Sequence, residues 1–176
     1  MTTAISYDKK TIYYHWITAA LILALWLIGQ NIDSFAKGGP KELVRSVHIL
    51  LGTVLAVVFV LRLRWKMVGG KKLPQAVPGL LGKVALGVHH LLYLLIGLTV
   101  LVGMFSVWVR GDLIFNWIHI PAFDPSDVPL KKQVEHLHEY LANSLIVLAS
   151  GHALMAVWHQ FGLRDGVLKR MWPTLK

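Results

Sequence analysis

The chain has 176 residues, of which 55% are hydrophobic and 15% charged, and its mean hydropathy is positive. This composition indicates an integral membrane protein rather than a soluble domain. The absence of cysteine excludes disulfides, cysteine-ligated iron–sulfur clusters and covalent haem attachment. The net charge of +9 is expected to follow from loop topology, so we predict no binding to nucleic acid.

Four apolar segments are long enough to cross a lipid bilayer as helices. In chain order we predict these helices at residues 12–30, 43–61, 85–108 and 137–160. Glycine and proline residues mark the connections between these helices. They occur at 38–40, at 69–70 and, as three prolines, in the longer third connection at about 110–133. Without an internal repeat, the pattern predicts an all-α membrane protein, a four-helix bundle forming one domain over residues 1–176.

The distribution of lysine and arginine predicts the orientation of these helices. Twelve of the eighteen basic residues fall in the N-terminal segment, the second connection and the C-terminal tail, where the acidic residues are Asp8 and Asp165. The opposite side holds six basic and seven acidic residues. We therefore expect both termini to be cytoplasmic, in a multi-pass protein of the bacterial inner membrane.

Histidines inside the apolar segments are the most informative feature. His138 and His152 lie fourteen residues apart, which carries a helix about 21 Å and returns it to nearly the same face. Ionisable side chains at this depth are costly, and they usually mark a functional pathway. Two imidazoles stacked in this way are typical of axial ligands for two stacked haems, although helix-packing histidines would give the same spacing.

Depth in the membrane sorts the histidines into pairs. By this criterion His48 pairs with His138 on the outside, and His15 pairs with His152 toward the cytoplasm. Each pair joins two helices, as ligation of one haem by two imidazoles requires. Because cysteine is absent, any haem would be of the b type. Other pairings stay open, since His89 in the third segment also lies toward the cytoplasm.

The residues around these histidines resemble bacterial cytochrome b561. The most specific string is HEYLAN at residues 138–143, followed by His152 and His159. Tyr14-His15-Trp16 supports it, as does His48 followed fourteen residues later by Arg62-Leu63-Arg64. The resemblance extends over essentially the whole chain. It reaches more distantly to the cytochrome b subunits of nickel–iron hydrogenase and formate dehydrogenase.

This resemblance implies a four-helix membrane bundle that holds two b haems. Carried over position by position, it implies His15 and His152 as ligands of the cytoplasmic haem and His48 and His138 as ligands of the outer haem. Members of the family move electrons between a donor and the quinone pool. Some of them oxidise superoxide at the outer haem and reduce ubiquinone, so the lipid bilayer and quinone are the expected partners.

Further residues near the helix ends are candidates for supporting roles. Four arginines could pair with haem propionates, unless they serve membrane topology alone: Arg45, Arg62, Arg64 and Arg110. Three residues toward the cytoplasm are candidates for quinone binding or proton relay: His89, His159 and Lys83. Gly52 and Gly151 lie near the histidines in sequence and would leave room for a macrocycle, or serve ordinary close helix packing.

Three functions remain open at this stage. The first is a stand-alone oxidoreductase that links superoxide, or another small periplasmic donor, to ubiquinone. The second is a membrane subunit that passes electrons for a separate dehydrogenase or hydrogenase. The third is a proton or metal transporter, which would be colourless and would show an inverted repeat. An outer side with six basic and seven acidic residues does not favour the steering of an anion such as superoxide.

Overall fold

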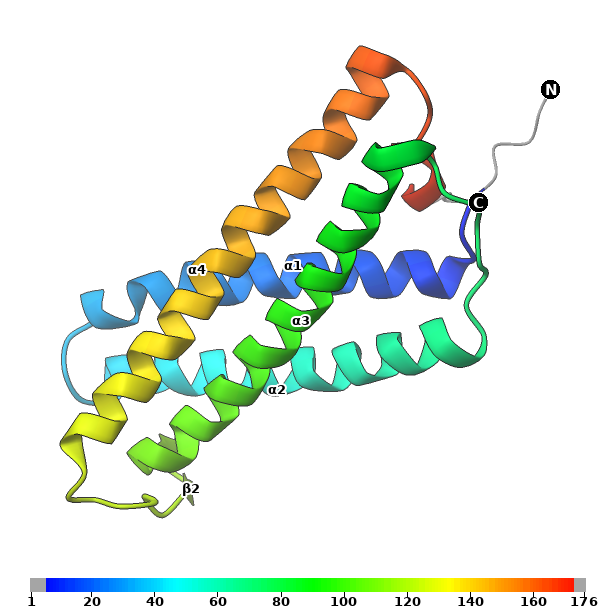
Figure 1. Cartoon of the computed structure of the whole chain (residues 1–176). Coiled ribbons are helices and arrows are strands. Elements are labelled where there is room, and N and C mark those ends of the chain that lie inside the picture. The colour runs from blue at the N-terminus through cyan, green and yellow to red at the C-terminus, as the bar shows by residue number, and fades with distance from the viewer. Residues whose placement is uncertain (1–5, 173–176) are drawn as a thin grey trace.

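The structure is a computed structural model and describes residues 6–172. Four long helices dominate it (Figure 1), namely α1 (Lys9–Asn31), α2 (Gly39–Val68), α3 (Gly79–Arg110) and α4 (Val128–Trp158). All four are long and apolar enough to cross a membrane. The prediction of four long apolar helices is therefore confirmed.

The helices begin before the predicted apolar segments, and all but α4 also end after them, because polar turns continue them; α4 ends at Trp158, where η2 follows. Pro40 and Pro129 lie in the first turns of α2 and α4, where a missing backbone N–H costs nothing. Asp8 and Asp127 cap α1 and α4 by accepting hydrogen bonds from backbone N–H groups. The prolines that were expected to lie in the connections between helices therefore lie in first helical turns instead.

Short elements complete the chain. A 3-10 turn η1 (Ile32–Ser34) follows α1, a π-helical turn η2 (His159–Leu163) extends α4, and η3 (Leu168–Met171) lies in the tail. The third connection forms a small antiparallel hairpin of β1 (Leu113–Ile114) and β2 (Ile118–His119), which we did not predict. Strands of two residues are too short to show the alternation of apolar and polar residues by which a strand is predicted from sequence.

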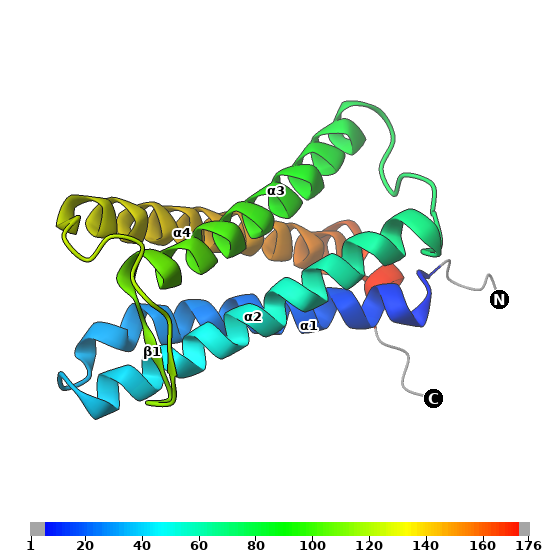
Figure 2. The same cartoon turned by 90° about the horizontal axis from the view of Figure 1, so that it is seen from below.

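The helices are arranged as two pairs. α1 packs mainly against α2 and α3 mainly against α4, whereas α1 and α4 meet over a short stretch only. Figure 1 shows the α3–α4 pair crossing the α1–α2 pair obliquely, and Figure 2 shows the hairpin reaching across α2. Large apolar side chains such as Val147 and Leu154 are exposed on the outside of the bundle. Lipid contact suits such a surface.

The two ends of the bundle differ in what they hold. Near the termini, the Tyr7 backbone N–H donates to the Arg170 carbonyl, and the Arg170 guanidinium donates to the Pro74 carbonyl at 2.8 Å. The N-terminal segment, the second connection and the C-terminal tail therefore meet at one end, which we call the terminal side. The other end carries the β1–β2 hairpin, and we call it the hairpin side.

Candidate functional site

Two histidine pairs lie between the helix pairs, one toward each end of the bundle. On the hairpin side, the ring centres of His48 (α2) and His138 (α4) are 6.3 Å apart with their planes at 87°. On the terminal side, those of His15 (α1) and His152 (α4) are also 6.3 Å apart, with planes at 80°. The structure thus brings together the same partners that depth in the membrane predicted.

The separation within each pair fits a metal held from opposite sides. Metal–imidazole bonds of about 2.0 Å place the ring centres of two opposed ligands roughly 6 Å apart. Among the described residues, no group of three or more His, Asp or Glu side chains could hold a bare metal ion. Two imidazoles per level suit haem, because its macrocycle supplies the other metal ligands.

The hydrogen-bond partners of the hairpin-side histidines indicate which ring nitrogen carries the proton. Nδ1 of His138 lies 3.1 Å from the Thr99 carbonyl, which can only accept, so Nδ1 carries the proton. Nε2 then keeps a free lone pair, the arrangement usual for metal-ligating histidine. Nδ1 of His48 is buried and makes no hydrogen bond of normal geometry within residues 6–172, although the Leu25 carbonyl is an acceptor beside it.

Two glycines leave space for the hairpin-side imidazoles. A Cβ built on Gly103 of α3 would lie 2.8 Å from Cε1 of His138, and one on Gly29 of α1 would lie 3.4 Å from Cε1 of His48. A side chain at Gly103 would therefore displace the ring. A Cβ at Gly52 or Gly151 would meet no described atom of a non-neighbouring residue within 4 Å, so the space beside these two glycines is open.

The terminal-side pair is surrounded by other polar groups. Nη2 of Arg62 lies 3.2 Å from Nδ1 of His15, so in this arrangement Nδ1 accepts and Nε2 carries the proton. Ligation of a metal through Nε2 would require the proton on Nδ1, so Arg62 would have to turn away from His15. The same guanidinium stacks on Tyr93, 5.0 Å from the ring centre, next to Lys66 at 4.2 Å.

His89 lies closer to this pair than its role as a quinone candidate suggested. Its ring centre is 5.1 Å from that of His152, and its Nδ1 donates to the Ala85 carbonyl at 2.6 Å. Nε2 of His89 is thus unprotonated in the neutral ring. The alternative pairing that involves His89 therefore stays open on geometric grounds.

The other arginines have distinct surroundings. Arg45 and Arg110 meet at Asp112, a residue that sequence reasoning missed even though it directly follows Arg110-Gly111. Arg64 is exposed and makes no side-chain hydrogen bond or ion pair with the described part of the chain. Only Arg62 lies directly against a candidate ligand.

The remaining quinone candidates are separate from one another. Nδ1 of His159, in η2, lies 2.5 Å from Oδ2 of Asp165, a partner that the sequence did not indicate. Lys83 is exposed near the start of α3, and none of the hydrogen bonds or ion pairs among residues 6–172 involves its side chain.

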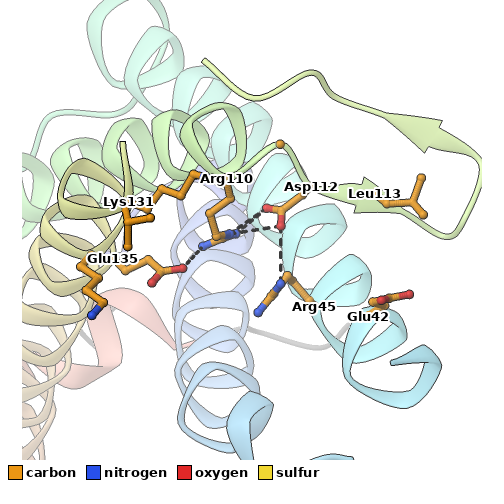
Figure 3. A pocket seen from close by; sticks show the side chains of 10 residues that line it. Glu42, Arg45, Arg110, Asp112, Leu113, Lys131 and Glu135 are labelled. Carbon is orange, nitrogen blue, oxygen red and sulfur yellow. Dashed lines mark hydrogen bonds and ion pairs between the residues drawn. The ribbon is translucent and has the colours of Figure 1, made fainter. Parts of the chain in front are cut away.

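A pocket of about 480 Å³ lies on the hairpin side, between the ends of α2, α3 and α4 (Figure 3). Its walls carry both signs of charge: Glu42, Arg45, Arg110, Asp112, Lys131, Lys132 and Glu135. The two lysines are therefore accompanied by three carboxylates, which agrees with the mixed charge expected for this side of the membrane.

Asn143, in the motif on α4, connects two helices. Its side-chain oxygen accepts hydrogen bonds from the Trp26 indole at 2.9 Å and from Gln30 at 3.3 Å, both on α1. This contact lies between the two histidine levels along α4. It ties α1 to α4, whose backbones otherwise approach each other little.

Comparison with known proteins decides the family. The sequence pattern of prokaryotic cytochrome b561 matches residues 6–174. The chain belongs to this family. Relatives include a cytochrome b562 of Cereibacter sphaeroides, 28% identical over 97% of this chain and 98% of the relative. A "probable superoxide oxidase" of Yersinia pestis is 24% identical over 95% of this chain and 96% of its own length.

A third relative matches only in part. A "probable Ni/Fe-hydrogenase B-type cytochrome subunit" of Rhizobium leguminosarum is 35% identical over 36% of this chain and 30% of its own length. The resemblance to cytochrome b561 is thus confirmed over nearly the whole sequence. Membership implies b-type haem and electron transfer at the membrane.

Proposed function

We propose that this chain binds two b haems and passes electrons across the bacterial inner membrane as a single domain with both termini in the cytoplasm. His48 and His138 would hold one haem, and His15 and His152 the other. The observation that carries the proposal is the equal 6.3 Å separation of two imidazole pairs. Fourteen residues of α4 set the two levels about 21 Å apart.

Haem iron supplies the one-electron chemistry when it is bound, and the chain supplies ligation, orientation and a surrounding of low polarity. The Thr99 carbonyl keeps the His138 ring in the tautomer that exposes Nε2. Arg62, which would have to leave His15 on ligation, could turn toward a propionate. Arg45 and Arg110 are the candidates for this role on the hairpin side, where both already pair with Asp112. Arg64 is a more distant candidate for the same role.

Electrons would exchange with ubiquinone near the terminal side. The His159–Asp165 pair could hydrogen-bond a quinone or pass on its proton, because the Asp165 carboxylate holds the His159 ring in place on this side of the bundle. His89 and Lys83 are the other candidates on this side. The donor would approach the hairpin side. Superoxide is one candidate donor, given the name of the Yersinia relative, although the mixed charge of the pocket does not select an anion.

A second candidate is an electron-transfer subunit for a separate dehydrogenase or hydrogenase. The partial match to the hydrogenase cytochrome subunit of Rhizobium favours it. The two candidate functions differ in whether a partner protein is required, because only the subunit needs a partner enzyme bound on the hairpin side. Co-purification of a dehydrogenase with the chain from native membranes would support the subunit, whereas donor-to-ubiquinone turnover by the chain alone would support the oxidoreductase.

The haem assignment is tested by purification in mild detergent, followed by oxidised and dithionite-reduced spectra and haem quantitation. We expect two low-spin b haems per chain. His48→Ala or His138→Ala should lose one haem, and His15→Ala or His152→Ala the other, while the exposed neighbour His136→Ala keeps both. A colourless protein that takes up no added haem would contradict the proposal. A His138→Ala protein with both haem signals intact would contradict the ligand assignment.

A further inference from the structure

Asp112 is a charged residue that is almost completely buried at the end of a membrane helix, with 6% of its surface exposed. The preceding Gly111 has a φ of 70° and ends α3, and a Cβ there would lie 2.8 Å from the Ala122 backbone N. This turn directs the Asp112 carboxylate back toward α3, and the backbone N–H of Asp112 still bonds to the Val107 carbonyl. Burial of a charge is tolerated only when it is paired.

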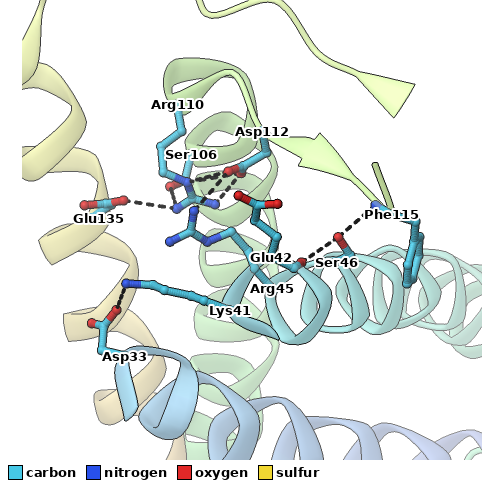
Figure 4. A network of polar contacts seen from close by, with 10 residues as sticks. All are labelled: Asp33, Lys41, Glu42, Arg45, Ser46, Ser106, Arg110, Asp112, Phe115 and Glu135. Atoms are coloured by element: carbon cyan, nitrogen blue, oxygen red, sulfur yellow. Dashed lines mark hydrogen bonds and ion pairs between the residues drawn. The ribbon is translucent and has the colours of Figure 1, made fainter. Parts of the chain in front are cut away.

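Two arginines from different helices pair with this carboxylate (Figure 4). Nε of Arg110 lies 3.1 Å from both carboxylate oxygens, and Nη1 of Arg45 lies 3.6 Å from Oδ1. Arg110 also donates to the Ser106 hydroxyl at 2.9 Å and to Glu135 at 3.3 Å. We call Arg45, Ser106, Arg110, Asp112 and Glu135 the arginine cluster.

The cluster forms the layer next to the hairpin-side histidines on three helices. Arg45 precedes His48 by three residues on α2, and Glu135 precedes His138 by three on α4. On α3, Ser106 follows Gly103, which touches the His138 ring, by three residues. Three residues of helix rise about 4.5 Å. The charged cluster therefore lies about one helical turn from the imidazole pair.

We infer that Asp112 is a positioning residue that sets the reduction potential of the haem held by His48 and His138. It holds Arg45 and Arg110 together beside this haem and offsets their charge, and it occupies guanidinium faces that a propionate would otherwise take. This inference rests on the proposed two-haem function. The Asp112 carboxylate is shielded from water, so it acts strongly on the charges close to it.

The sign of the effect follows from charge. Reduction adds one electron, so a nearby carboxylate disfavours the reduced state and a nearby guanidinium favours it. Removal of the Asp112 charge should therefore raise the midpoint potential of the hairpin-side haem, and removal of the Arg110 charge should lower it. The haem held by His15 and His152 lies about 21 Å away along α4 and should not respond.

The test is a spectroscopic redox titration of the purified two-haem protein. Asp112→Asn should shift one of two midpoint potentials upward, and Arg110→Gln should shift the same one downward. In the His15→Ala background, which would retain only the hairpin-side haem, the Asp112→Asn shift should persist. Asp124→Asn is the matched control, because Asp124 is an exposed carboxylate of the same connection that contacts Ser126, and it should shift neither potential.

The outcomes separate this inference from the function on which it rests. A wild-type protein without two titrating haems would overturn the two-haem function. Two titrating haems with both potentials unchanged in Asp112→Asn would overturn only the role of Asp112, as would equal shifts of both. If Asp112→Asn does not fold, Glu135→Gln removes a more exposed member of the cluster, and the same haem should shift upward by less; no shift would again overturn the inference.

Discussion

At the scale of the residue, the histidines are explained by the groups that contact them. An imidazole in an apolar helix is stabilised only if its ring nitrogens are used. His138 donates a hydrogen bond from its Nδ1–H to the Thr99 carbonyl, and His89 donates one from its Nδ1–H to the Ala85 carbonyl. In both neutral rings Nε2 is then the unprotonated nitrogen and is available as a ligand.

Gly103 gives a prediction at this scale. The Gly103→Ala substitution puts a Cβ 2.8 Å from the His138 ring, so the ring must shift. We expect loss of the hairpin-side haem, with the haem content falling from two to one per chain. Haem quantitation and reduced spectra measure this. Gly87→Ala on the same helix is the control, since its Cβ meets no described atom within 4 Å, and it should keep both haems.

At the scale of the element, the helix ends are held by polar side chains that the apolar pattern does not reveal. Asp8 accepts hydrogen bonds from the Thr11 amide at 3.0 Å and hydroxyl at 2.7 Å, the Trp65 indole at 3.0 Å and the Lys71 amide at 3.0 Å. It therefore caps α1 and also fastens it to the end of α2. Burial raises the pKa of the Asp8 carboxyl, but these hydrogen bonds outweigh that effect and hold the pKa well below its usual range.

Removal of this carboxylate should destabilise the terminal side. At pH 7 we expect Asp8→Ala to lower the free energy of unfolding by about 1 kcal/mol, the usual loss for a helix cap. Because the folded-state pKa is lowered, the carboxylate stabilises the fold above its ordinary pKa of about 3.9, and this contribution is lost as the pH falls toward the lowered pKa.

The measurement is thermal unfolding in detergent across pH. The gap in melting temperature between wild type and Asp8→Ala should be constant near neutrality and narrow below about pH 4. Lys9→Ala, an exposed neighbour on the first turn of α1, should leave the melting temperature nearly unchanged. A gap that widens in acid would show that the carboxylate is not stabilising the fold.

At the scale of the whole molecule, two helix pairs cross and leave the histidines between them. The pairs α1–α2 and α3–α4 each pack closely, whereas each histidine pair joins helices from different pairs. Bound haem would therefore join the two helix pairs. Loss of a ligand should then lower the stability of the bundle as well as the haem absorbance. The charge asymmetry of the two ends predicts the orientation of the molecule in the membrane.

Topology provides the prediction at this scale. Reporter fusions at either terminus should behave as cytoplasmic, with a fluorescent protein active and alkaline phosphatase inactive. A phosphatase inserted after Asp124, in the connection on the hairpin side, should be active. Twelve of the eighteen basic residues lie on the side of the termini, and the positive-inside rule then determines the outcome. Phosphatase activity at the C-terminus would contradict this orientation.

Some of these features could be predicted from the sequence, and others could not, for physical reasons. The helices were predictable because each needs only a continuous apolar run. Their ends were not, since Pro40 and Pro129 look like breaks but occupy first turns. The proximity of His48 to His138 and of His15 to His152 was predictable, because depth follows from position along a helix. The π-helical turn at His159 and its contact with Asp165 depend on local backbone geometry that no pattern reveals.

The sequence by itself determined the membrane class, the four helices and the family, because composition, helical period and motifs are properties of single segments; it proposed the histidine partners but left His89 open. Only the tertiary structure decided that both pairs are 6.3 Å apart, that Gly103 rather than Gly52 borders a ring, and that Asp112 gathers two arginines beside His48 and His138. These contacts depend on how one helix pair crosses the other. No single segment contains that information.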